Sequence, residues 1–167
     1  MKGAGGHGPR ADYSEMLPGP YALDESGLVA WGSRIGASVA VPAVFALHGD
    51  LGAGKSVLAR AIAVGAGVAA HMPSPTFNLR FEYQGERARI QHLDLYRLND
   101  PSEVWELGWR DLGYDEEIVL IEWPQRAEAL LPAPRWDVFL EFAPHDSLLR
   151  HVSLRRIGEA PDLPVPQ

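Results

Sequence analysis

The chain contains no cysteine and only two lysines, and no apolar run is long enough to span a bilayer. Without cysteine the protein has neither a disulfide nor a thiolate metal site. Without a long apolar run, a membrane-spanning helix is not expected. The first twenty residues are rich in Gly and Pro and carry no hydrophobic segment of a secretory signal. We therefore expect neither membrane association nor a disulfide framework.

The 167 residues suit a single domain, and their formal net charge at pH 7 is −7. An acidic chain lacks the broad positive surface that attracts nucleic acid. Positive charge gathers near the C-terminus at Arg150, Arg155 and Arg156, whereas residues 111–117 are acidic. Charged segments of this kind are most often solvated surface, so we expect no DNA binding and no direct binding of RNA by this chain alone.

Residues 49–56 read Gly-Asp-Leu-Gly-Ala-Gly-Lys-Ser, the spacing of a P-loop. Glycines leave room for backbone N–H groups to wrap a phosphate, and the following helix adds its own free N–H groups. Lys55 would neutralise the β- and γ-phosphates, and the Ser56 hydroxyl would bind Mg²⁺. A glycine-rich surface turn is the alternative, but it would not require one of the two lysines. We expect nucleotide contacts from Gly49, Asp50, Leu51, Gly52, Ala53, Gly54, Lys55, Ser56 and Val57.

The apolar pattern predicts alternating strands and helices. We expect strands over 43–48, 78–83, 88–95, 118–121, 136–142 and 148–157, and helices over 25–40, 56–66, 101–107 and 125–131. Two pairs of adjacent strands should form hairpins, and the strand before the P-loop should be buried. The predicted fold is an α/β P-loop NTPase, a three-layer sandwich with a mixed, partly parallel central sheet. One domain over 21–157 would lie between a flexible leader, 1–20, and a flexible tail, 158–167.

Two acidic residues end expected strands, where P-loop enzymes hold Mg²⁺ or its waters. Glu122 follows the apolar run 118–121, and Asp94 ends the run that begins at Ile90. An acid at the tip of a buried strand is costly unless a cation or hydrogen bonds compensate it. Glu122 could instead be a structural cap or ion-pair partner, and Asp94 could simply pair with Arg97.

A proline-stiffened loop over 72–76 follows the expected P-loop helix and contains Ser74 and Thr76. Loops in this place often sense the γ-phosphate, although a plain turn hydroxyl is equally compatible with the sequence. His92 alternates with apolar residues and is interpreted as a half-buried structural histidine. The chain has no Asn-Lys-x-Asp motif for guanine, which argues against a regulatory GTPase.

Four stretches together resemble the TsaE family, the small ATPase of bacterial tRNA threonylcarbamoyladenosine synthesis. Each motif beyond the P-loop is weak alone, but the Asp-Leu-Tyr-Arg and Glu-Trp-Pro elements together are specific. The resemblance covers roughly residues 23–142. The four stretches are Gly49–Ser56, Ser74-Pro75-Thr76-Phe77, His92-Leu93-Asp94-Leu95-Tyr96-Arg97-Leu98 and Glu122-Trp123-Pro124-Gln125.

The resemblance implies a cytoplasmic, Mg²⁺-dependent ATPase that binds ATP or ADP. It also implies partners, the synthase subunits of the TsaD and TsaB type, which transfer threonylcarbamoyl to tRNA. These partners would stimulate an ATPase that is weak alone, and tRNA would be reached only through them. Hydrolysis would drive or reset the complex and would not perform the transfer.

Carried onto this chain, the resemblance makes Lys55, Asp94 and Glu122 the catalytic residues. Ser56, Glu122 and Asp94 would be the Mg²⁺ ligands, with Asp94 acting on either the metal or the attacking water. Val57 departs from the family, which commonly has a second hydroxyl at this position, so the α-phosphate contact there would rest on the backbone. Further nucleotide contacts would come from Ser74, Thr76, Glu25 and Arg126.

Two other functions are compatible with the residues. A small P-loop metabolite kinase would have a similar size, but nothing in the sequence marks an acceptor site. A non-enzymatic assembly factor could use nucleotide only to select a conformation. Turnover in the presence of partners separates the ATPase from the assembly factor, and a phosphorylated small-molecule product would indicate the kinase.

Overall fold

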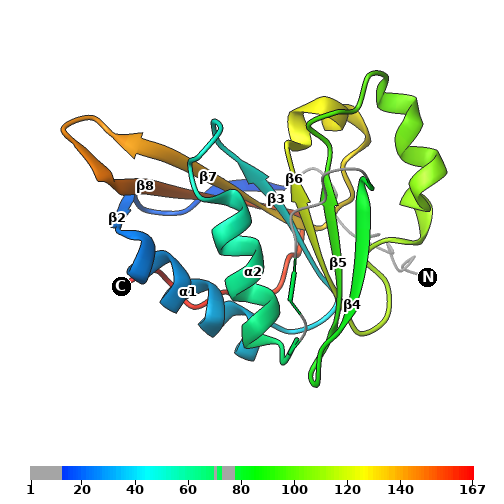
Figure 1. Ribbon diagram of the computed structural model, residues 1–167, viewed down its shortest axis with the longest axis horizontal. Helices are drawn as coiled ribbons and strands as arrows, with labels where there is room; N and C mark the ends of the chain where they lie inside the picture. Colours follow the sequence, from blue (N-terminus) through cyan, green and yellow to red (C-terminus); the bar gives the residue numbers. More distant parts are fainter. Residues whose placement is uncertain (1–12, 70, 73–77) are drawn as a thin grey trace, which may run out of the picture.

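The computed structural model describes residues 13–69, 71–72 and 78–167 (Figure 1). Within them the strands form one sheet in the order β1-β8-β7-β3-β6-β5-β4, with β2 also paired to β8. The strands are β1 (Ser14–Met16), β2 (Tyr21–Leu23), β3 (Ala43–His48), β4 (Arg80–Gln84), β5 (Arg89–Asp94), β6 (Glu117–Glu122), β7 (Arg135–Ala143) and β8 (Asp146–Ile157). The helices are α1 (Glu25–Ser38), α2 (Lys55–Gly65) and the 3₁₀ segments η1 (Pro101–Leu107), η2 (Trp109–Asp111) and η3 (Pro124–Leu130).

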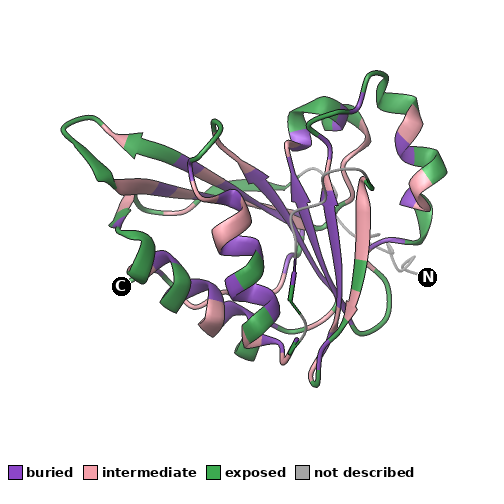
Figure 2. Ribbon diagram, viewed as in Figure 1, coloured by how far each residue is buried: buried purple, intermediate pink, exposed green. Residues whose placement is uncertain are grey.

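The centre of the sheet is parallel and its flanks are antiparallel. Strand β3 lies parallel to β6 and β7, and β5 lies parallel to β6. The β4–β5 and β7–β8 pairs are the two expected hairpins. The predicted α/β fold with a mixed, partly parallel sheet is therefore confirmed. Because β3 and β6 are paired on both sides and covered on both faces, their side chains are buried along nearly their whole lengths (Figure 2).

Alternate side chains of the central strands enter two separate apolar cores, which makes the sandwich three-layered. Phe45 and Leu120 belong to the core under α1 and α2, which lie together on one face of the sheet (Figure 1). Val44 and Val119, one residue earlier in each strand, belong to the core beneath the 3₁₀ segments on the other face. The two-residue period of a strand produces this division.

Glycines allow α1 and α2 to pack closely. A Cβ on Gly36 would lie 1.9 Å from the carbonyl oxygen of Ile62, and one on Gly65 would lie 2.1 Å from that of Ser33. No substituent fits at these distances, so the backbones themselves are in contact. Helix α1 begins with Asp24, whose carboxylate accepts a hydrogen bond from Gly27 N–H at 2.7 Å. The predicted helix start is therefore confirmed.

Two expected short helices are present as 3₁₀ segments. Segment η1 has a capping box between Asp100 and Glu103 and a proline in its first turn. Gly108, at φ 69°, ends it after seven residues. The 3₁₀ form is common in short segments of this kind.

The C-terminal segment 158–167 was expected to be a flexible tail, but the structure places it against the core. Trp31 Nε1 donates to the carbonyl oxygen of Pro164 at 2.6 Å, and Trp136 Nε1 donates to that of Pro161 at 2.8 Å. Ala160 is fully buried. Two buried indole N–H groups need acceptors, and this segment supplies them.

The leader over 1–20 also differs in part from its expectation, because β1 pairs with β8 over Ser14–Met16. Strand β2, at the start of the expected domain, pairs with β8 as well. Residues 1–12 lie outside the described part of the chain. Among the described residues, the longest helix has 14 residues, and none has the length and apolar character needed to cross a membrane.

Candidate nucleotide-binding site

The P-loop connects the carboxyl end of β3 to the first turn of α2, as the sequence predicts. Gly52 and Gly54 adopt φ values of 80° and 105°, which L-residues with side chains rarely adopt. A Cβ on Gly49 would lie 2.6 Å from the carbonyl oxygen of Leu140, so β7 packs directly against the loop. The loop is therefore compact, and its helix presents free N–H groups at its start.

Lys55 lies under the loop and is only 4% exposed. Its Nζ donates to the carbonyl oxygens of Gly49 at 2.6 Å and Asp50 at 2.8 Å. The same ammonium lies 4.1 Å from the centroid of the Trp123 ring, a cation–π distance. Burial lowers the pKa of Lys55, and the carboxylates of Glu122, Asp94 and Asp50 oppose that change. These contacts hold the Lys55 ammonium at the mouth of the loop.

Glu122 ends β6 and is almost completely buried beside the start of α2. Ser56 Oγ lies 2.9 Å from one carboxylate oxygen of Glu122 and 3.0 Å from the other, and donates to the carboxylate. His92 Nε2 lies 2.8 Å from Glu122 Oε1, and His92 is 1% exposed. The carboxylate is therefore held by two side chains from two other elements of the fold.

Asp94 lies directly opposite Glu122 in the register between β5 and β6. Its Oδ1 accepts a hydrogen bond from the backbone N–H of Tyr96 at 3.0 Å. Burial raises the pKa of Asp94 and the charge of Glu122 adds to the rise, while the Tyr96 hydrogen bond opposes both. The two acids at neighbouring strand ends thus line the same cavity.

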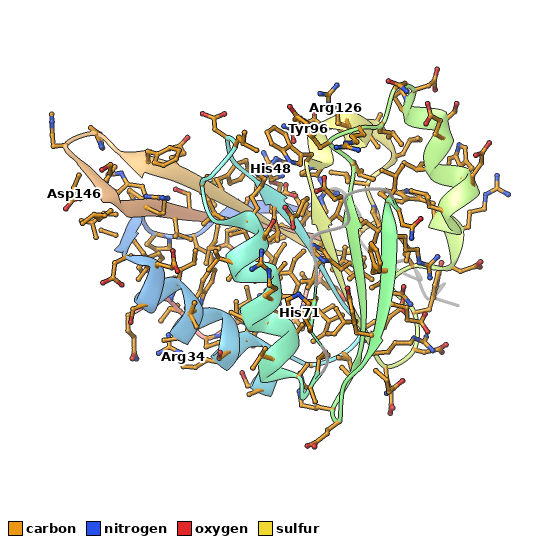
Figure 3. All side chains as sticks on the ribbon, in the orientation of Figure 1. Arg34, His48, His71, Tyr96, Arg126 and Asp146 are labelled. Carbon is orange, nitrogen blue, oxygen red and sulfur yellow. The ribbon has the colours of Figure 1, made fainter. Side chains whose placement is uncertain are left out.

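A cavity of about 310 Å³ is lined by the tip and end of the P-loop, by both acids and by two aromatic residues. The aromatic residues are Tyr96 and Trp123, with ring centroids 4.8 Å apart. Arg126 lies over the Tyr96 ring at 5.8 Å, and Figure 3 shows the two side chains close together at the top of the sheet. Arg126 therefore borders this cavity through Tyr96 and is absent from its lining.

A second, smaller cavity of about 140 Å³ lies on the other side of the loop. Its lining includes Glu25 from the first turn of α1, Val57 from α2, and Leu148 and Arg150 from β8. The structure thus places Glu25 next to the P-loop, whereas Arg126 lies on the opposite side. Ser74 and Thr76 lie outside the described residues.

Behind the loop, on the sheet face away from α1 and α2, the buried Asp137 carboxylate gathers three basic side chains. Arg135 Nε lies 2.8 Å from it, and Arg155 Nη2 lies 2.6 Å from it. His48, the residue before the P-loop and labelled in Figure 3, has its Nε2 at 3.5 Å from the carboxylate. Its ring stacks on that of Phe139. Burial raises the pKa of Asp137, but His48, Arg135 and Arg155 together outweigh burial and hold the pKa well below its usual range.

Sequence reasoning missed the role of His92 and the contacts of Arg150. The interpretation of His92 as half-buried was wrong, because the side chain is buried and bonded to Glu122. A signal existed, since His92 and Asp94 are two residues apart and share a strand face. For Arg150 the sequence offered only a basic stretch near the C-terminus.

The donors at the strand ends fit Mg²⁺ better than a resident transition metal. Among the described residues, no group of three or more His, Cys, Asp or Glu side chains is placed to hold a metal ion. Ser56, Glu122 and Asp94 offer oxygen atoms alone. Mg²⁺ commonly takes one or two protein oxygens and completes its shell with phosphate oxygens and water.

A family model described as "Threonylcarbamoyl adenosine biosynthesis protein TsaE" matches residues 23–152. The chain belongs to the TsaE family. Curated relatives named "tRNA threonylcarbamoyladenosine biosynthesis protein TsaE" include the Bacillus subtilis protein, 32% identical over 75% of this chain and 78% of its own length. The Synechocystis protein is 34% identical over 69% of this chain and 72% of its own length. The Haemophilus influenzae protein is 44% identical over 52% of this chain, and the match spans only 54% of that relative.

The crystal structure of Bacillus subtilis YdiB has the same fold. It superposes with a TM-score of 0.64 over 87% of this chain and 88% of its own, at 23% sequence identity. This likeness agrees with the α/β topology described above. The chain therefore belongs to a family described as one of threonylcarbamoyl adenosine biosynthesis.

Proposed function

We propose that this chain is the ATP-binding and ATP-hydrolysing subunit of the complex that forms threonylcarbamoyladenosine in tRNA. The observation that carries the proposal is the convergence of Lys55, Ser56, Glu122 and Asp94 on one cavity at the mouth of a P-loop. The catalytic roles of Lys55, Asp94 and Glu122 and the binding of ATP, ADP and Mg²⁺ are part of this proposal. So is a cytoplasmic location.

In the proposed reaction, backbone N–H groups of the loop bind the phosphates and Lys55 neutralises the β- and γ-oxygens. Ser56, Glu122 and Asp94 would hold Mg²⁺ or its waters. When bound there, Mg²⁺ would supply charge neutralisation for the transferring phosphoryl group. Water is the acceptor of that group, and catalysis rests on positioning and electrostatic stabilisation.

Glu122 is the residue best placed to change partners during this cycle. It now accepts from Ser56, and both groups have the chemistry of Mg²⁺ ligands. His92 would keep the carboxylate aimed at the loop while Ser56 turns toward the metal. Asp94, on the adjacent strand, would bind a metal-bound water or orient the attacking one.

The proposal includes partners, synthase subunits of the TsaD and TsaB type, with tRNA reached only through them. The acidic net charge of −7 supports this indirect route, because electrostatic binding of tRNA needs a positive surface. We propose that the ATPase is weak alone and that partner binding completes the site. A metabolite kinase is less well supported, because nothing in the sequence marks an acceptor site.

The deciding experiment measures phosphate release from MgATP with and without the purified TsaD- and TsaB-type subunits, with Lys55→Ala as the blank. Strong stimulation by the partners, absent from the blank, is the expected result. No turnover in either condition, with ATP binding intact, would contradict hydrolysis and favour the nucleotide-gated assembly factor. A phosphorylated small molecule formed in cell extract would favour the kinase.

A further inference from the structure

Arg150, on β8, contacts the P-loop from the side of the smaller cavity, away from the two acids. Its Nε donates to the carbonyl oxygen of Ala53 at 3.1 Å, and its Nη2 lies 3.4 Å from that of Gly52. These two residues are 97 and 98 positions away in the sequence. Ala53 is fully buried and belongs to the core under α1 and α2, so this part of the loop cannot swing away freely.

The guanidinium is itself held in place by the hairpin. Its Nη1 donates to the carbonyl oxygens of Ser147 at 2.6 Å and Leu149 at 3.1 Å, and its centre lies 4.2 Å from the Phe142 ring. An arginine presents five N–H donors in a planar fork, and both sides of this fork are used. Arg150 therefore joins the β7–β8 hairpin to the P-loop as one unit.

A P-loop binds phosphate only when its N–H groups point inward, which directs its carbonyl oxygens outward. An unpaired acceptor is costly where it is buried, so the carbonyl of the buried Ala53 needs a protein donor. Gly52 is exposed, and its contact with Arg150 is the longer one. Inside the loop, Ala53 N–H is bonded to the Asp50 carbonyl oxygen at 3.0 Å. Arg150 supplies the donors on the other side for Gly52 and Ala53.

We propose that Arg150 is a positioning residue, which holds the Gly52 and Ala53 peptides in the orientation that binds phosphate. The proposal rests on the proposed function, because it presumes that nucleotide binds at this loop. Arg150 touches the carbonyl oxygens of the loop and the backbone of the hairpin. It acts on nucleotide affinity by keeping the loop preorganised, so it should affect binding more than the chemical step.

The test compares MgADP dissociation constants, measured by calorimetry, for the wild type, Arg150→Gln, Arg150→Lys and Arg156→Gln. Arg156 is the matched control on the same strand, with the same change of charge, and its contacts are Ala160, Asp162 and the Trp136 ring. We expect Arg150→Gln to bind about tenfold more weakly, Arg150→Lys to recover only part of the loss, and Arg156→Gln to bind as the wild type does.

Hydrogen exchange of the amides in residues 49–56 provides the second readout. In Arg150→Gln these amides should exchange faster, while those of α1 stay as protected as in the wild type. With the partner subunits present, the KM for MgATP should rise by about the same factor as the dissociation constant while kcat stays within about twofold. A merely structural loss would lower protection throughout and reduce kcat with it.

Three outcomes would overturn the proposal. They are wild-type affinity in Arg150→Gln, full recovery with lysine, and an equal loss in Arg156→Gln, which would indicate charge alone. Failure of the proposed function is a separate result, because the wild type itself would then bind no more MgADP than Lys55→Ala. If Arg150→Gln fails to fold, Arg150→Lys still decides, since a wild-type affinity in that variant contradicts the fork geometry.

Discussion

His92 Nε2 lies 2.8 Å from Glu122 Oε1, and the two side chains are only 1% and 3% exposed. The carboxylate also accepts from Ser56, which lies within hydrogen-bond distance of both its oxygens. A buried carboxylate needs such partners, because burial without hydrogen bonds is costly. The pair places the acid beside the P-loop before any ligand arrives.

Glu122→Gln tests the acid directly. The amide keeps the size of the side chain and its bond to His92, but it removes the charge that would bind Mg²⁺ or its waters. We expect MgADP affinity to change by no more than a few fold and partner-stimulated phosphate release to fall about 100-fold. Steady-state phosphate release and calorimetry measure the two quantities. Turnover equal to that of the wild type would remove Glu122 from the proposed catalytic set.

Replacing His92 tests the positioning of that acid. His92→Leu removes the histidine contact and leaves Ser56 as the side-chain partner of the carboxylate. We expect turnover to fall about tenfold while nucleotide still binds. His92→Gln is the matched control, because its Nε2 can donate from nearly the same place. Recovery of most of the turnover by glutamine supports hydrogen-bond positioning. Equal losses in both variants would argue for a packing role.

Asp137 gives a prediction for stability against pH. Its pKa is depressed in the folded state, so its contribution is present above the unfolded pKa, about 3.9 for aspartate, and is lost as the pH falls through the folded pKa. At pH 7 we expect Asp137→Asn to lower the free energy of unfolding by about 2 kcal/mol, because it removes the buried charge that the basic side chains face. The loss is moderate because two of these partners, Arg135 and Arg155, are partly exposed.

Urea denaturation of Asp137→Asn and the wild type at pH 7, 5, 4 and 3 measures this difference. The difference should be constant from pH 7 to 5 and should shrink below about pH 4. His48→Gln changes the longest of the three contacts, at 3.5 Å, and should have a smaller effect at pH 7. A difference independent of pH down to 3 would contradict the ionic role of this carboxylate.

Gly36→Ala tests the close packing of α1 on α2. The new methyl group would meet the Ile62 carbonyl oxygen at 1.9 Å, and backbone on both sides resists movement. We expect a loss of about 1–3 kcal/mol in the free energy of unfolding. Gly27→Ala, on the same helix, places its methyl 3.3 Å from side-chain atoms of Asp24 and Leu23 and should be nearly neutral. Thermal unfolding of both variants measures the contrast.

Much of the fold followed from local patterns. The apolar run 43–48, the P-loop and the apolar run 118–121 predicted β3, the start of α2 and β6, and the structure has all three. Strand periodicity and turn residues act over a few neighbours, so one sequence suffices to recognise them. The docked C-terminal segment was not predictable in this way, because its partners Trp31 and Trp136 are far away in the chain.

The sequence by itself determined which functional groups are present, namely a P-loop with one lysine and acidic residues at the ends of two strands. The register between β5 and β6, which sets Asp94 opposite Glu122, came only from the sheet. The tertiary structure also decided which groups hold that chemistry in place, His92 on Glu122 and Arg150 on the loop. These contacts join residues that are 30 to 98 positions apart in the chain. They depend on how the layers of the fold pack together, which a local sequence pattern does not predict.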